Sequence, residues 1–142
     1  MSEYARGLEG VIANESSLSN VIGKIGELSY VGYHIDDLVE NCCYEEIIFL
    51  LHHNRLPNAT ELAAFEKGLR SDRNLPAQVI DFLKNAPKDA SPMDVLRTAV
   101  SMLGLYDHRA KIGEPDMEAN AAIALSLCSQ AATIVAAYHR FR

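Results

Sequence analysis

The stretch that decides the fold is residues 119–137, ANAAIALSLCSQAATIVAA. Its nineteen residues include eight alanines and no Asp, Glu, Lys or Arg, in a chain that is 23% charged overall. Alanine has the highest helix propensity, and neither Gly nor Pro occurs between Asp116 and Arg142. The stretch therefore predicts a long helix that buries nearly all of its sides.

Two environments could bury such a helix. A membrane span needs about 20 predominantly apolar residues, whereas polar side chains interrupt this stretch at Asn120, Ser126, Ser129, Gln130 and Thr133. Small side chains also allow neighbouring helices to approach closely. The composition favours a helix packed within a soluble protein, either at the centre of a helical body or against another subunit, and we expect no membrane partner.

Size and charge narrow the class of protein. The 142 residues fit one domain that can bury a sizeable core, and a hydrophobic content of 49% is ordinary for a folded chain. The net charge is −6, and residues 1–66 carry eleven acidic side chains against three basic ones. This acidic front argues against a nucleic-acid partner, because such partners require basic surfaces.

The cysteines and the N-terminus indicate a reducing compartment. Cys42, Cys43 and Cys128 form neither a disulfide framework nor a zinc-ligand spacing. The first residues contain no basic segment followed by an apolar run, which is the pattern of a secretory signal. We therefore expect a cytoplasmic protein without a metal site.

Residues suited to catalysis are scattered. His52 and His53 are adjacent, so they point about 100° apart on a helix and cannot share one site. Helix-end, surface or loop positions explain the histidines better than catalysis does: they are His34, His52, His53, His108 and His139. No glycine-rich nucleotide motif is present. The residues alone predict no catalytic, cofactor-binding or metal-binding side chain.

The hydrophobic period changes from two to 3.6 along the chain. Short apolar pieces predict a β ribbon over residues 1–33, with a glycine-bearing turn at residues 23–26. The pieces are Val11 with Ile12, Leu18, Val21 with Ile22, and residues 28–31. Helical periodicity follows over residues 34–142 and predicts about six helices. The fold class is therefore mainly α, preceded by a short β ribbon.

Local signals mark several helix ends. Cys43 with Glu46, and Asn58 with Glu61, have the spacing of N-terminal capping pairs. Leu56 and Pro57 are expected to end the helix that Cys43 opens, and Pro76 to lie in the first turn of a later one.

Ser91 and Pro92 predict the start of a helix that ends at Gly104. That helix carries two apolar stripes, which predict two buried faces. The stripes are Met93, Leu96, Val100 and Leu103, and Val95, Ala99 and Met102.

The order of these pieces resembles the N-terminal region of citrate synthases, over essentially the whole chain. The matching segments are GLEGVIA (7–13), GELSYVGYHIDDL (26–38), YEEIIFLLH (44–52), RLPN (55–58), SPMDVLRTAVS (91–101) and AATIVAAY (131–138). By this resemblance the chain is the N-terminal segment of a citrate synthase large domain, residues 1–142, and the small domain and catalytic part are absent.

The resemblance also implies an activity. Citrate synthases condense acetyl-CoA with oxaloacetate to give citrate and CoA, and methylcitrate synthases use propionyl-CoA. Their catalytic aspartate, histidines and arginines lie in the later part of family chains, and none maps onto a position here. We therefore expect the segment to contribute fold and subunit contacts without being active by itself. A stand-alone helical module that assembles with itself or with a separate catalytic part is the alternative.

Citrate synthases are homodimers, and the resemblance places the two helices beginning near Ser91 and Met117 in the subunit interface. The predicted interface residues are Met93, Leu96, Val100, Leu127, Ala131, Ile134 and Val135. The last helix is still in phase at Arg142, with no capping glycine or following proline. Either the two terminal bases complement the helix dipole at a natural end, or the chain is truncated.

Overall fold

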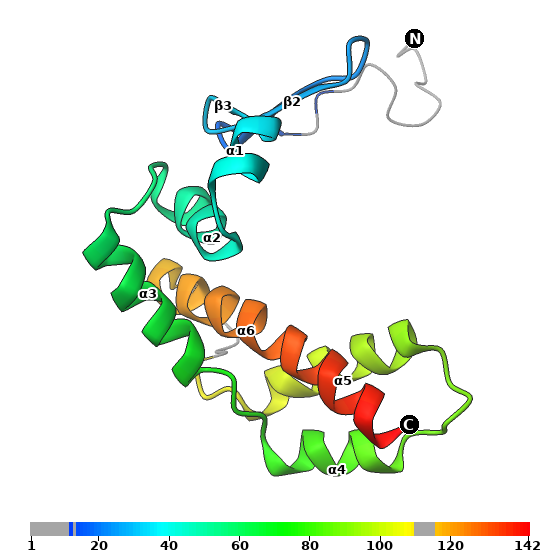
Figure 1. Ribbon diagram of the computed structural model, residues 1–142. Coiled ribbons are helices and arrows are strands. Elements are labelled where there is room, and N and C mark those ends of the chain that lie inside the picture. The colour runs from blue at the N-terminus through cyan, green and yellow to red at the C-terminus, as the bar shows by residue number, and fades with distance from the viewer. Residues whose placement is uncertain (1–11, 13, 110–115) are drawn as a thin grey trace, which may run out of the picture. The chain divides into compact units, whose positions relative to one another are not determined.

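The computed structural model describes residues 12, 14–109 and 116–142, and these confirm a mainly helical fold with a small antiparallel sheet (Figure 1). The described helices are α1 (Ile35–Asn41), α2 (Tyr44–His53), α3 (Ala59–Ser71), α4 (Ala77–Asn85), α5 (Pro92–Tyr106) and α6 (Met117–Phe141). The chain divides into two compact units, Met1–Leu62 and Ala63–Arg142. We describe each unit by itself.

The predicted ribbon is a three-stranded sheet in the order β1-β2-β3, formed by β1 (Ser19–Ile22), β2 (Glu27–Tyr30) and β3 (Tyr33–His34). β1 and β2 pair antiparallel, and the predicted turn at residues 23–26 connects them. Within this turn the Ile25 N–H donates a hydrogen bond of 3.1 Å to the Ile22 carbonyl. Leu18 and Ile12 lie outside the strands, so their assignment was wrong, and Val11 is outside the described residues.

β3 was not foreseen, and it carries the sheet to His34, one residue beyond the predicted boundary. Val31 was assigned to a strand, but Val31 and Gly32 form a two-residue turn in which both have positive φ, of 49° and 85°. That backbone matches the twist of an antiparallel hairpin. Glycine adopts it freely, whereas a β-branched side chain is strained in it.

The first two helices have side-chain caps. Nδ1 of His34 accepts a hydrogen bond from the Asp36 N–H (3.4 Å) at the start of α1. The predicted Cys43 and Glu46 pair is confirmed, since Glu46 Oε2 accepts from the Cys43 N–H at 2.7 Å. α2 ends at His53, before the predicted stop, because Asn54 adopts the left-handed conformation that terminates helices.

The corner between α2 and α3 is held by a second capping pair, also as predicted. Oδ1 of Asn58 accepts from the N–H groups of Thr60 and Glu61, both at 3.0 Å, and Glu61 Oε2 accepts from the Asn58 N–H at 2.9 Å. Arg55 donates to both oxygens of Glu61, at 2.6 and 2.9 Å. These contacts lower the pKa of Glu61 to about 2, with the Arg55 hydrogen bonds as the largest cause.

In the unit Ala63–Arg142, helices α4, α5 and α6 pack together around one apolar core (Figure 1). The buried core residues are Val79, Leu83, Ala86, Val95, Ala99, Leu103, Ile134 and Tyr138. Leu83 and Val79 are completely buried, which anchors α4 between the two longer helices. Burial of this kind supplies the main stabilising free energy of such a unit.

Two details of α4 and α5 differ from expectation. Pro76 precedes α4 as its cap instead of lying in its first turn. Pro92 occupies the first turn of α5 as predicted, but the Ser91 hydroxyl makes no capping bond, and backbone N–H groups of Asp94 and Val95 bond to the Ser91 carbonyl instead. Gly104 does not end α5, which continues to Tyr106, because a single glycine costs only about 1 kcal/mol in a helix held by packing.

α6 confirms the predicted long helix, with 25 residues. Asp116, which the sequence analysis missed, caps it through Oδ1, which accepts from the N–H groups of Glu118 (3.0 Å) and Ala119 (3.1 Å). Its length and the mean hydropathy of 1.6 in its most apolar 18 residues would suit a membrane span, and within its unit it packs against α4 and α5. Within the chain alone Ala132, Val135 and Ala136 remain exposed, so not all its sides are buried.

Candidate subunit interface

The predicted interface residues fall into three degrees of exposure. Met93 on α5 and Val135 on α6 are 68% and 55% exposed, which is unusual for apolar side chains of this size. Ile134 is only 1% exposed and belongs to the core. The remaining four are half-buried: Leu96, Val100, Leu127 and Ala131.

A shallow groove joins several of these residues. It lies between the first turns of α5 and the last turns of α6, and its volume is about 210 Å³. The lining residues are Pro92, Leu96, Ile134, Val135, Tyr138, His139 and Arg142. Ile134 can therefore contribute to a contact surface only from within the groove. The groove combines aliphatic walls with two basic residues, and no carboxylate lines it.

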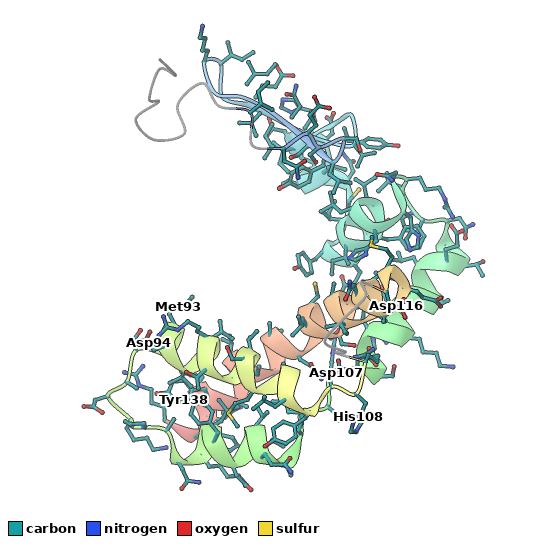
Figure 2. The ribbon with its side chains drawn as sticks, turned by 180° about the vertical axis from the view of Figure 1, so that it is seen from behind. Met93, Asp94, Asp107, His108, Asp116 and Tyr138 are labelled. Carbon is teal, nitrogen blue, oxygen red and sulfur yellow. The ribbon has the colours of Figure 1, made fainter. Side chains whose placement is uncertain are left out.

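The opposite end of α5 is polar, and Figure 2 shows Asp107 and His108 there, far along the helix from Met93. Arg109 donates to Oδ1 and Oδ2 of Asp107 (2.9 and 2.8 Å) and to the Ser126 hydroxyl (3.0 Å). These hydrogen bonds lower the pKa of Asp107 and raise that of Arg109. An arginine that binds two neighbours in this way makes a structural contact.

The histidines occupy separate places. His34 caps α1, and His53 packs its ring on Phe49 with 4.1 Å between the ring centroids. The other three, His52, His108 and His139, have exposed side chains. Over the ranges that the structure describes, no three His, Cys, Asp or Glu side chains gather as metal ligands would.

The cysteine thiols at the junction of α1 and α2 are poorly suited to act as nucleophiles. Partial desolvation and the neighbouring Glu46 carboxylate raise the pKa of the Cys42 thiol, and desolvation is also the largest cause of the raised pKa of Cys43. A raised pKa leaves less of the reactive thiolate.

A small sheet before six described helices, with exposed apolar side chains on the last two, defines a mainly helical protein. Comparison with known proteins gives the family. The protein-family model described as "Citrate synthase, C-terminal domain" matches residues 7–142, so the chain belongs to the citrate synthase family.

Individual relatives agree with this assignment. Citrate synthase 2 of Bacillus subtilis is 45% identical over 138 residues, which are 96% of this chain and 36% of that protein. The 2-methylcitrate synthase 2 of Corynebacterium glutamicum is 46% identical over 106 residues, 75% of this chain and 28% of that one. The crystal structure of citrate synthase from Pyrobaculum aerophilum superimposes with a TM-score of 0.85 at 32% identity, covering 95% of this chain and 35% of that chain. The matched residues thus span 28% to 36% of the length of these relatives.

Proposed function

We propose that the chain is the N-terminal portion of a citrate synthase-type enzyme, which condenses acetyl-CoA with oxaloacetate to give citrate and CoA in the cytoplasm. The observation that carries this proposal is the 45% identity to a citrate synthase over 96% of the chain. In that enzyme these residues would form the front of the large domain and supply subunit contacts, whereas the catalytic groups would come from the part of the relatives that this chain does not span.

The 142 residues alone are then expected to be inactive. The described histidines are caps, stacked rings or exposed side chains, and the cysteines have raised thiol pKa values. The test is release of free CoA thiol from acetyl-CoA in the presence of oxaloacetate, with a full-length relative as positive control. Turnover by the isolated chain above a heat-denatured sample would contradict the proposal.

A methylcitrate synthase is the second candidate, because identity to a 2-methylcitrate synthase is equally high, at 46% over 106 residues. Its acyl donor would be propionyl-CoA. A chimera in which this chain replaces the matching segment of a citrate synthase tests whether these residues influence the choice. A change in the ratio of kcat/KM for acetyl-CoA and propionyl-CoA would favour a role in selecting the donor.

We further propose a symmetric homodimer through α5 and α6. Exposed Met93 on α5, exposed Val135 on α6 and the groove that Val135 lines offer apolar surface of the kind that isologous interfaces bury. Ala132→Glu places a charge on the exposed side of α6 and should convert a dimer to a monomer in sedimentation velocity. Ala63→Glu, at an exposed position of α3, is the matched control. An unchanged mass for Ala132→Glu would contradict this interface.

The same experiment addresses the alternative of a stand-alone oligomerisation module. A module would assemble stably by itself, whereas a monomer at micromolar concentration would count against it.

A further inference from the structure

One stripe of α6 carries most of its polar contacts to the rest of its unit. Ser126, Gln130, Tyr138 and Arg142 are separated by multiples of four residues, with Ile134 at the remaining position of the series. Residues four apart are neighbours on a helix, each turned by about 40° from the one before, so these side chains form a stripe that winds gradually around α6. Ser126, Ile134 and Tyr138 of this series are buried at 3%, 1% and 4% exposure.

The first half of the stripe binds the connection between α3 and α4. The Ser126 hydroxyl donates to Oδ2 of Asp72 at 2.6 Å and accepts from Arg109 at 3.0 Å, so it bridges two opposite charges. One turn later, Nε2 of Gln130 donates to the Asn74 carbonyl at 3.1 Å.

The second half binds the connection between α4 and α5. The Tyr138 hydroxyl donates to the Pro87 carbonyl at 3.0 Å, and Nε of Arg142 donates to the Lys88 carbonyl at 2.9 Å. Nζ of Lys88 in turn donates to the Phe141 carbonyl near the end of α6. α6 is therefore attached at both ends of α4, through residues 51 to 56 positions distant in the sequence.

Apolar packing holds α6 in its unit mainly through Ile134 and Tyr138, which belong to the buried core. A shift of one residue moves a helix by about 1.5 Å and turns its face by about 100°. Such a shift would turn Ile134 and Tyr138 away from the core. The same shift would break every hydrogen bond of the stripe, and buried polar groups left without partners are costly.

We propose that the stripe of Ser126, Gln130, Tyr138 and Arg142 sets the rotation and axial position of α6, and so determines which side of the helix faces outward. The side opposite to the middle of the stripe carries the exposed residues Ala132 and Ala136. This inference concerns a conformational device within one unit and does not depend on the proposed function. Single buried polar residues specify register in a comparable way in coiled coils.

Cys128 on α6 has a half-buried thiol, and its rate of reaction under native conditions depends on the rotation and axial position of α6. The experiment uses the chain with Cys42→Ser and Cys43→Ser, and measures the rate of reaction with 5,5′-dithiobis(2-nitrobenzoate). In the double variant Ser126→Ala and Gln130→Ala we expect the rate to change by about tenfold without denaturant, because alternative positions of α6 become populated.

Two controls separate register from stability. Thr133→Val removes a hydroxyl that bonds only within α6, to the Ser129 carbonyl at 3.3 Å, and should leave the rate unchanged. Val79→Ala weakens the core without touching the stripe, so any increase in the rate of the Cys128 thiol should come through global unfolding, with the denaturant dependence of unfolding. If the double variant does not fold, Tyr138→Phe replaces it as the stripe variant, because it deletes one oxygen and keeps the ring. The proposal is overturned if the stripe variants behave like Thr133→Val or like Val79→Ala.

Discussion

Replacing Val31 by Asn should stabilise the sheet, although it exchanges an apolar residue for a polar one. Val31 and Gly32 connect β2 to β3, and both have positive φ. The substitution creates Asn-Gly, the pair most favoured in a two-residue hairpin turn with this backbone. The Val31 N–H donates to the Leu18 carbonyl at 3.0 Å, and this bond is retained because it involves only backbone atoms.

The expected gain follows from the dihedral angle. The left-handed conformation costs an ordinary residue about 1–2 kcal/mol, and asparagine tolerates it much better. Against this stands the partial burial of the valine side chain, whose loss costs a fraction of the 1.5–3 kcal/mol for complete burial. We therefore expect a net stabilisation of the hairpin of about 1 kcal/mol.

Hydrogen exchange of the backbone amides in β2 and β3 measures this locally. A gain of about 1 kcal/mol slows exchange by about fivefold where the hairpin opens before the whole unit unfolds. Val21→Asn is the matched control, because Val21 is 69% exposed in β1 of the same sheet and has no positive φ. Exchange that is equally fast or faster in Val31→Asn than in the unchanged chain would show that the valine is not strained there.

Three further substitutions test other contacts. Arg55 lowers the pKa of Glu61 to about 2 from 4.5. This pair therefore stabilises the fold above about pH 4.5, and the stabilisation is lost as the pH falls towards 2. Glu61→Gln should reduce the pH dependence of urea unfolding between these two pH values. Asp116→Ala should lower the free energy of unfolding by about 1 kcal/mol in thermal melts, and Asp116→Asn should retain most of it. Leu83→Ala, at a fully buried site, should cost about 2–5 kcal/mol, measured by urea unfolding.

The features predicted correctly are those that depend on residues close in the sequence. Asn58 and Glu61 are three residues apart, so the capping pair forms whatever surrounds the corner. Pro92 can begin a helix because its ring already holds the required φ. The long helix follows from alanine content alone. Each of these features has a physical cause within a few residues of sequence and needs no tertiary contact.

The errors arise where packing or backbone geometry overrides local preference. Gly104 is a common helix terminator, but here α5 continues because Leu103 is buried in the core and the Asp107 N–H bonds to its carbonyl at 3.1 Å. Val31 has a strong strand propensity, which conceals the turn that makes β3 possible. In both cases the preference of one residue is smaller than the free energy of the contacts around it.

The interface prediction shows the same limit. Periodicity places Met93 and Leu96 on one stripe of α5 and Val95 and Ala99 on another, and both are apolar. Only the packing of α4 shows that Val95 and Ala99 face the core, which leaves Met93 exposed. Ile134 and Val135 are likewise adjacent in sequence and opposite in exposure, at 1% and 55%. A list chosen from apolar character alone therefore mixes core residues with surface residues.

The hydrogen-bond partners of the polar residues of α6 could not be predicted from composition. In the sequence Ser126 and Gln130 count only as interruptions of an apolar run. In the structure their partners are Asp72 and the Asn74 carbonyl, more than fifty positions away and in a connection with no recognisable motif. A helix this rich in alanine needs specific contacts to be held in one position, and the few polar side chains within it are the groups able to make them. Ser126 and Gln130, two of the five residues that argue against a membrane span, are thus also members of the stripe proposed to position the helix.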